Sequence, residues 1–245
     1  MTRIIVHGAG RMARRVLAQL PNFEGFELLG LVSRNRPEDD LGVDWHAALA
    51  EFNSTAELLI DFTLPGGTRT AAQWCACNGV ALLSGTTGLT DGDIGALRNA
   101  ALKIPVLWAP NLSHGMALMT ALVRQMALAT DPAAAVTITD IHHRHKLDAP
   151  SGTALALAAA VQESHALRAT AARNTAGFDP VFSSVREGEV VGEHTVRFTL
   201  PDEVLEITHK ALDRDVFARG ALKAAEWLVR QPPGYYSSGD WLGLR

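Results

Sequence analysis

The segment from residue 142 to residue 153 holds the densest group of side chains in the chain that could do chemistry. It reads His-His-Arg-His-Lys-Leu-Asp-Ala-Pro-Ser-Gly-Thr. Histidine exchanges protons near physiological pH, and Lys146 adds a positive charge. Ser151 is a good N-cap for a helix that starts at Gly152 and Thr153, where free N–H groups would bind a carboxylate. The grouping predicts a site where a small anionic substrate gains a hydride and a proton.

Two other interpretations compete with this one. A solvated basic loop would not account for the helix start that follows it. A metal site would use His142, His143 and His145, but these lack a carboxylate or cysteine partner at a familiar spacing. We therefore expect no bound metal.

A glycine turn follows the first apolar run of the chain. Its residues fit the pattern G-x-G-x-x-A: Gly8, Ala9, Gly10, Arg11, Met12 and Ala13. Gly8 allows a tight turn, Gly10 lets the backbone approach a pyrophosphate, and Ala13 permits close packing of helix on strand. Short glycine patterns also occur in ordinary strand-to-helix turns. The position of this one at the first strand–helix junction favours dinucleotide binding.

The end of the second predicted strand bears on the choice of cofactor. An NAD site usually has a carboxylate there for the ribose 2′-OH, whereas this chain has Ser33, Arg34, Asn35 and Arg36, with no carboxylate before Glu38. An arginine could neutralise a 2′-phosphate, so the sequence favours NADPH, with NADH tolerated. The alternative is that both arginines are simply solvated.

The elements that must position these residues change in pattern along the chain. In the first part, apolar strand-like runs (4–6, 26–32, 58–62, 80–83, 106–109) are interleaved with helical patterns (12–20, 67–78, 91–103). Strands that alternate with helices predict a parallel sheet with helices on both faces. We therefore expect a Rossmann-type α/β domain.

The second part predicts a different domain. A helix at 113–129, a strand at 136–141 and a helix from 151 precede three alternating stretches at 181–185, 193–200 and 203–209. Consecutive strands with short joins predict a mixed or antiparallel sheet, and hence a smaller α+β domain. A last helix at 215–229 returns to the first domain. The expected boundaries are 1–112 with 212–245 for the dinucleotide-binding domain, and 113–211 for the second.

Composition and charge exclude several classes of function. The net charge is −4 with 47% hydrophobic and 20% charged residues, which does not suggest a nucleic-acid or membrane partner. No apolar run would span a bilayer, and the N-terminus lacks a signal peptide, so we expect a cytoplasmic protein. Cys75 and Cys77 are two residues apart in a predicted helix and do not share a face. We expect two buried, reduced thiols, as suits a reducing cytosol.

The motifs together resemble the dihydrodipicolinate reductase family. The segment 142–153 resembles its signature loop, and further motifs follow in family order over nearly the whole chain. They are Asp61-Phe62-Thr63, Gly85-Thr86-Thr87-Gly88, Ala109-Pro110-Asn111-Leu112-Ser113, Val191-Gly192-Glu193-His194 and Ile207-Thr208-His209-Lys210-Ala211. The resemblance implies reduction of 4-hydroxy-tetrahydrodipicolinate by NAD(P)H in diaminopimelate and lysine synthesis.

The resemblance also implies roles for individual residues. His142 and Lys146 match the catalytic proton donors, and His143, Gly152 and Thr153 match residues that bind the substrate carboxylates. Segments that bind the cofactor are matched by Gly8 to Ala13, Gly85 to Thr87, and Ala109, Pro110, Asn111 and Leu112. To these the residue chemistry of the loop after the second strand adds Ser33 and Arg34. The family implies a homotetramer in which the second domains, which bind substrate, join their sheets.

A few positions depart from the family pattern. The glycine turn is one residue shorter than the common form, and Ser33 replaces a frequent acidic residue. Arg219 replaces an asparagine, with no consequence that we can assign. Two other functions stay open at this point: a related dehydrogenase acting on an amino-acid imine such as that of aspartate, and a cofactor sensor that has lost catalysis. The presence of both His142 and Lys146 favours the reductase.

Overall fold

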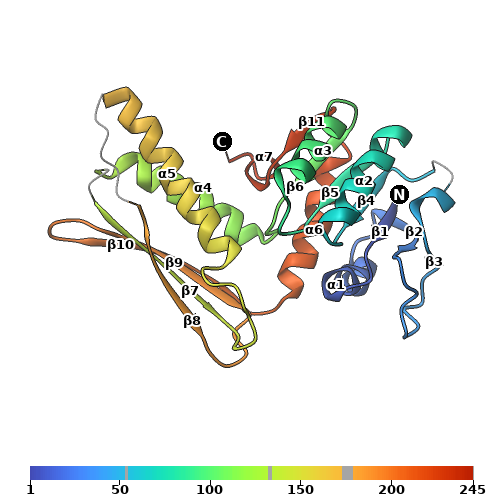
Figure 1. Cartoon of the computed structure of the whole chain (residues 1–245), viewed down its shortest axis with the longest axis horizontal. Coiled ribbons are helices and arrows are strands. Elements are labelled where there is room, and N and C mark those ends of the chain that lie inside the picture. The colour runs from blue at the N-terminus through green and yellow to red at the C-terminus, as the bar shows by residue number, and fades with distance from the viewer. Residues whose placement is uncertain (53–54, 132–133, 173–178, 245) are drawn as a thin grey trace. The chain divides into compact units, whose positions relative to one another are not determined.

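The computed structural model describes residues 1–52, 55–131, 134–172 and 179–244. These residues form two compact units (Figure 1). The first consists of Met1–His114 with Asp215–Gly243, and the second covers Gly115–Arg214. Each unit is described by itself below.

The first unit is built on a parallel sheet. Its seven strands in the described part of the chain are β1 (Thr2–His7), β2 (Phe26–Val32), β3 (Trp45–His46), β4 (Leu58–Asp61), β5 (Ala81–Ser84), β6 (Pro105–Trp108) and β11 (Gly234–Tyr236). The spatial order is β11-β6-β5-β4-β1-β2-β3, and all neighbours are parallel. The chain therefore reverses its direction of winding between β1 and β4, which is the switch point of a Rossmann-type sheet.

Helices cover both faces of this sheet (Figure 1). They are α1 (Arg11–Gln19), α2 (Pro65–Asn78), α3 (Asp91–Ala101) and α6 (Asp215–Leu228), with short helices η1 (Leu20–Asn22), η2 (Leu49–Glu51) and α7 (Ser238–Trp241). Ile4 and Val6 of β1 pack in one core cluster with α1 and α6, while Ile5 packs in the other with α2 and α3. Because strands buried on two faces need apolar side chains on both, their sequences read as continuous apolar runs.

The second unit has a mixed sheet with helices on one face (Figure 1). Among its described residues the strands are β7 (Ala135–His142), β8 (Val181–Arg186), β9 (Gly192–Thr199) and β10 (Val204–Ala211), in the order β10-β9-β7-β8. Only β7 and β8 are parallel; the other neighbouring pairs are antiparallel. Helices α4 (His114–Ala129) and α5 (Gly152–Ala172) cover the inward side chains of β7 and β9.

The predicted fold class is confirmed: a Rossmann-type α/β unit is joined to a smaller α+β unit. The edge strands β3 and β11 lie outside the predicted pattern. The thiol prediction is correct for Cys75, which is buried, and wrong for Cys77, which is exposed. None of the described helices combines the length and the apolar character needed to cross a membrane.

Gly220→Ala tests how closely α6 packs on the segment after β6. A Cβ at Gly220 would overlap the carbonyl oxygen of Leu112, and overpacking costs about 1–3 kcal/mol. Gly95 in α3 is the matched control, because a Cβ there meets open space and alanine in a helix interior gains about 0.5–1 kcal/mol. Urea unfolding followed by circular dichroism should give a lower midpoint for Gly220→Ala and a slightly higher one for Gly95→Ala. Equal midpoints would contradict this packing.

Candidate active site

The residues predicted to bind the cofactor gather at one edge of the parallel sheet. The glycine turn follows β1, Ser33 follows β2, Gly85 follows β5 and Ala109 follows β6. Because parallel strands end at the same edge, all four segments lie at the carboxyl edge, where α/β sheets bind their ligands. The residues predicted for the substrate lie in the second unit.

The glycine turn has the geometry that a pyrophosphate needs. Gly8 has φ +106°, and a Cβ there would lie 2.5 Å from the carbonyl oxygen of Phe62, so only glycine fits. Gly10 is the N-cap of α1, and a Cβ there would meet nothing within 4 Å, which leaves open space before the first N–H groups of the helix. Ala13 is fully buried in the core. The residues of this turn therefore fit a bound dinucleotide.

The segments after β5 and β6 are held by hydrogen bonds to the strand ends. Thr86 is 3% exposed and donates its hydroxyl to Asp61 at 3.0 Å, while Thr87 is exposed. The N–H of Ala109 donates to the carbonyl of Ser84 at 3.1 Å. Fixed in this way, the segments present Thr87 and the exposed Pro110 toward solvent.

The loop after β2 holds its arginines in different ways. Arg36 lies over the ring of Trp45, 5.9 Å from its centroid, and the indole N–H of Trp45 donates to the hydroxyl of Ser33 at 3.1 Å. Arg34 is exposed. Among the described residues it has neither a stacking partner like that of Arg36 nor an acidic partner.

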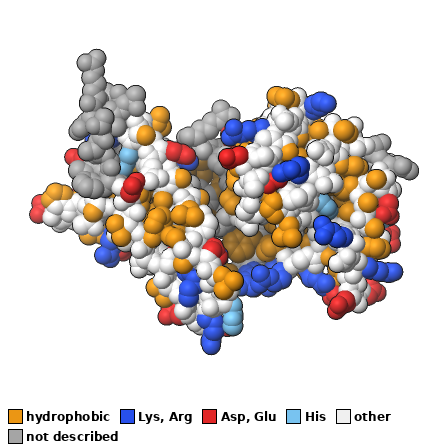
Figure 2. Space-filling model, viewed as in Figure 1, with side chains coloured by type: hydrophobic (Ala, Val, Ile, Leu, Met, Phe, Trp, Pro, Cys, Tyr) orange, Lys and Arg blue, Asp and Glu red, His pale blue; other side chains and the backbone are white. Residues whose placement is uncertain are grey.

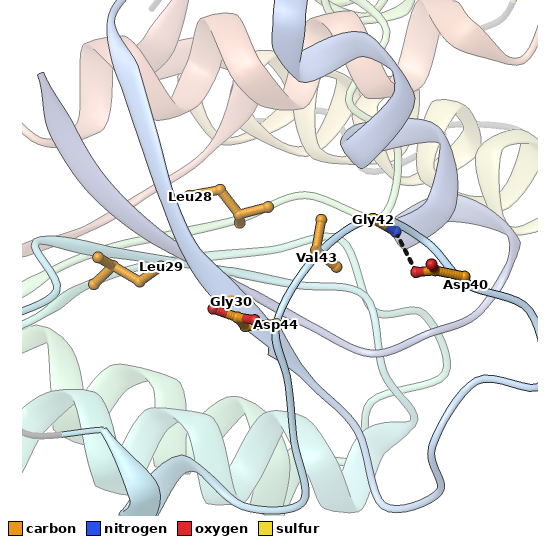
Figure 3. Close-up of a pocket in the computed structure, with 7 residues that line it drawn as sticks. All are labelled: Leu28, Leu29, Gly30, Asp40, Gly42, Val43 and Asp44. Carbon is orange, nitrogen blue, oxygen red and sulfur yellow. Dashed lines mark hydrogen bonds between the residues drawn. The ribbon is translucent and has the colours of Figure 1, made fainter.

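A separate pocket of about 460 Å³ lies beside the middle of β2 (Figure 3). Residues of β2 and of the loop before β3 line it: Leu28, Leu29, Gly30, Asp40, Gly42, Val43 and Asp44. The N–H of Gly42 donates to Asp40 at 2.8 Å. The pocket is not at the carboxyl end of the strand, and its two carboxylates would repel phosphate. We therefore do not assign the cofactor to it.

The second unit brings the predicted catalytic residues to the end of β7. His142 is its last residue and is 9% exposed. Its Nδ1 lies 3.3 Å from the carbonyl oxygen of Val191, and its Nε2 lies 3.4 Å from Nε2 of His194. Lys146, in the loop that follows, donates to both carboxylate oxygens of Asp148 at 2.7 and 2.8 Å.

The predicted carboxylate-binding residues lie close by in the chain. Ser151 accepts a hydrogen bond from the N–H of Ala154 at 3.1 Å, which confirms it as the N-cap of α5. Gly152 is exposed, and both Thr153 and His143 are half-buried. Figure 2 shows basic and histidine side chains gathered at this end of the second unit, over the loops after β7 and β8. An anionic ligand would meet positive charge and helix N–H groups there.

The sequence analysis assigned no role to the buried polar cluster beneath His142, although Gly192 and His194 lie in one of the family motifs. Asp140 is fully buried and pairs with Arg186, Nη1 to Oδ2, at 2.9 Å. His194 is 4% exposed and lies 3.1 Å from the hydroxyl of Ser151. A Cβ at Gly192 would come within 2.9 Å of the His142 ring, so glycine makes room for the imidazole. One signal was present in the sequence: polar residues at inward positions of alternating strands.

Burial sets the protonation of both histidines. The pKa of His142 is lowered, first by burial and then by the charge of Lys146. Burial, and then the charge of His142, lowers the pKa of His194 to about 4. Burial would raise the pKa of Asp148, but the hydrogen bonds from Lys146 outweigh it and the pKa is lowered. At neutral pH the two imidazoles are therefore neutral. No three histidine, cysteine or carboxylate side chains converge as a metal ion would need in the part of the chain described.

A Rossmann-type unit with a glycine turn after β1, in one chain with a unit that carries histidines, Lys146 and a capped helix start, is typical of a nicotinamide-dependent reductase. Family models agree. The model for dihydrodipicolinate reductase, N-terminus, matches residues 2–112, and the model for dihydrodipicolinate reductase, C-terminus, matches residues 115–242. The chain belongs to the dihydrodipicolinate reductase family.

Individual relatives are similar over almost their full length. The chain is 40% identical to a 4-hydroxy-tetrahydrodipicolinate reductase of Alkalilimnicola ehrlichii, covering 99% of both chains. It is 40% identical to the enzyme of the same name from Xanthomonas euvesicatoria, covering 97% of this chain and 96% of the relative. The predicted family and the predicted class of enzyme, an NAD(P)H-dependent reductase, are confirmed.

Solved structures support the fold. A dipicolinate-bound dihydrodipicolinate reductase from Paenisporosarcina sp. TG-14 superposes with a TM-score of 0.80 at 23% identity, covering 98% of both chains. An aspartate dehydrogenase from Thermotoga maritima gives a TM-score of 0.52 at 13% identity, covering 92% of this chain and 96% of that one. The second likeness is one of fold alone and does not favour an aspartate dehydrogenase function.

The lowered histidine pKa values predict a stability that falls in mild acid. A group whose folded pKa is lowered stabilises the fold above its unfolded pKa, near 6.5, and this contribution is lost as the pH falls toward the folded pKa. For His194 the shift to about 4 corresponds to about 3 kcal/mol. Urea unfolding should show that the wild type is clearly less stable at pH 4.5 than at pH 7. The difference between the two pH values should be smaller in His194→Gln. Equal stability at both pH values would refute the assignment.

Proposed function

We propose that this chain is a 4-hydroxy-tetrahydrodipicolinate reductase of diaminopimelate and lysine synthesis. One observation carries the proposal: the second unit holds His142, Lys146 and the capped start of α5, in a chain whose first unit has a dinucleotide-binding fold. The 40% identity over 99% of both chains supports the same substrate. The relative from Paenisporosarcina, with dipicolinate bound, supports a small dicarboxylate ligand.

The predicted dinucleotide-binding domain, residues 1–112 with 212–245, would hold the cofactor. The glycine turn from Gly8 to Ala13 would receive the pyrophosphate at the start of α1. The segments Gly85 to Thr87 and Ala109 to Leu112 would border the nicotinamide half. When bound, NAD(P)H supplies the hydride.

The predicted substrate domain, residues 113–211, would bind and protonate the substrate. Gly152 and Thr153 offer backbone N–H groups, and His143 an imidazole, to the two carboxylates. The Lys146 ammonium stabilises charge on the ring nitrogen and its carboxylate, and supplies the proton there together with His142. Asp148 holds this ammonium through two hydrogen bonds until a substrate carboxylate competes for it.

A coupled assay tests the proposal directly. The substrate is made in place from pyruvate and aspartate semialdehyde by a synthase, and oxidation of NADPH or NADH is followed by absorbance. Oxidation should require the synthase product. If a folded sample that binds cofactor oxidises nothing, the proposal fails, and other cyclic imines, the aspartate imine and a sensor role become the alternatives.

Lys146→Ala should lower kcat about 100-fold or more, since general acid catalysis contributes about 10²–10⁴-fold and the variant also loses a charge at the carboxylate site. Arg144→Ala is the matched control, because Arg144 is an exposed neighbour that lies 3.8 Å from Glu189. Its kcat should stay within about two-fold of the wild type. If steady-state kinetics show similar losses of kcat in both variants, Lys146 does not have the proposed catalytic role.

The choice between NADPH and NADH rests on the loop after β2. Arg36 is stacked on Trp45, and Arg14 is paired with Asp39. Arg34 is exposed, with no such contact among the described residues. We therefore assign the 2′-phosphate to Arg34 and favour NADPH, with NADH as a weaker cofactor.

Arg34→Ala should raise the KM for NADPH about ten-fold and leave the KM for NADH nearly unchanged, because a charge-assisted hydrogen bond contributes about 1.5–3 kcal/mol. Arg36→Ala is the control, since that guanidinium is held over Trp45. Initial rates with each cofactor give the answer. Equal effects of Arg34→Ala on both cofactors would rule out a phosphate contact.

The same proposal includes a homotetramer in the cytoplasm. Among its exposed side chains, the open face of the second sheet and its edges carry Val181, Val185, Val204 and Leu205. Exposed apolar side chains on a sheet are a surface that a second copy can cover. Light scattering coupled to size exclusion measures the mass of the assembly.

A further inference from the structure

Both ring nitrogens of His142 face the interior of the second unit. Nδ1 lies 3.3 Å from the carbonyl oxygen of Val191. Nε2 lies 3.4 Å from Nε2 of His194, and 3.7 Å from Oδ2 of Asp140. The two imidazoles meet edge to face, with ring centroids 5.1 Å apart. The protonation state of each ring therefore depends on the other.

The hydrogen positions follow from what each neighbour can do. The carbonyl of Val191 can only accept, so the hydrogen of neutral His142 sits on Nδ1 and its Nε2 needs a donor. Nδ1 of His194 is buried and has no hydrogen-bond partner among the described residues. A buried N–H without a partner is more costly than a buried lone pair. His194 therefore carries its hydrogen on Nε2, between Nε2 of His142 and the hydroxyl of Ser151.

We propose that His194 is a positioning residue for His142: it donates its Nε2 hydrogen to Nε2 of His142 and fixes that ring as the neutral tautomer with hydrogen on Nδ1. The same donor lies 3.1 Å from the hydroxyl of Ser151, which caps α5. One imidazole thus links the predicted acid–base residue to the helix start that is predicted to bind carboxylate.

The charged form of His142 is disfavoured by this arrangement. A proton on its Nε2 would face the N–H of His194. To accept that proton, His194 would have to carry its own hydrogen on the buried Nδ1. The charged and titratable groups around the pair are Asp140 on β7, Lys146 in the following loop, Arg186 on β8 and His209 on β10.

The consequence for the reaction rests on the proposed function. In the proposed function, His142 and Lys146 share the supply of the proton. A neutral His142 has no spare proton to give at neutral pH, so the Lys146 ammonium delivers the proton first and His142 takes part by accepting one. His194 itself touches neither substrate nor cofactor in this account.

Nitrogen-15 NMR of the full-length protein tests the tautomer without any turnover. The His142 resonances are assigned by their loss in His142→Gln. In the wild type at pH 7 we expect a neutral ring with hydrogen on Nδ1. In His194→Gln the amide can either donate or accept, so the pKa of His142 should rise by about one pH unit. The corresponding ionisation in the pH profile of kcat/KM should move by the same amount.

His165→Gln is the matched control, because His165 is also a buried histidine of this unit, on α5. It should leave the His142 titration unchanged. A His142 that carries hydrogen on Nε2 or is charged at pH 7 overturns the proposal, even if His194→Gln does not fold. An unchanged His142 pKa in folded His194→Gln also overturns it. If the coupled assay finds no turnover but the tautomer is as expected, the proposed function fails and the positioning role stands.

Discussion

The first unit depends on one buried carboxylate at the switch point of its sheet. Asp61 ends β4 and is fully buried. Among the described residues, its oxygens lie within hydrogen-bond distance of one imidazole and four hydroxyls: His7, Thr63, Thr68, Ser84 and Thr86. Burial alone would raise its pKa, but the interactions with His7 and the hydroxyls outweigh burial and the pKa is lowered. The carboxylate therefore stays charged and binds the ends of β1, β4 and β5 and the first turn of α2 together.

Once those ends are fixed, the glycines of the cofactor loops become a requirement. Phe62, the next residue, occupies the space between two loops. Its carbonyl lies where a Cβ of Gly8 would be, and its ring lies where a Cβ of Gly85 would be. Side chains at either position would force the loops away from β4. The close approach of both loops to Phe62 therefore requires glycine at these two positions.

The sequence predicted those parts of the molecule in which local pattern and environment agree. The central strands are buried on both faces and read as apolar runs, so they were found. The edge strands β3 and β11 are two and three residues long, too short to show a period. Cys77 follows Thr70 and Gln73 on the exposed face of α2 at helical spacing, so the helix period places it toward solvent. The expectation of burial came from the apolar character of cysteine and not from this period.

The candidate site was predicted for its loops, and less well for what lies beneath them. His142 and Lys146 were predicted because they stand in a dense polar segment. Asp140 and His194 stand in strands of alternating pattern, where no role was assigned to either, and they are directly opposite each other in the β7–β9 register. Their inward direction follows from the period of two. Their pairing requires the register, which the sequence does not fix because Val181 to Ala211 offers several ways to align three strands.

The two units hold a buried carboxylate in different ways, and the difference matters for the histidine beside each. Asp61 is satisfied mainly by neutral hydroxyls. Asp140 accepts one hydrogen bond, from the hydroxyl of Ser184, and its charge is balanced by Arg186, whose Nη1 is 2.9 Å from Oδ2. Nε2 of His142 is 3.7 Å from the same oxygen. A lone carboxylate at that distance would favour a protonated His142. Arg186 lies closer to the Asp140 carboxylate than the His142 ring does, and its positive charge offsets the negative charge of Asp140. Burial and the charge of Lys146 then keep the His142 imidazole neutral.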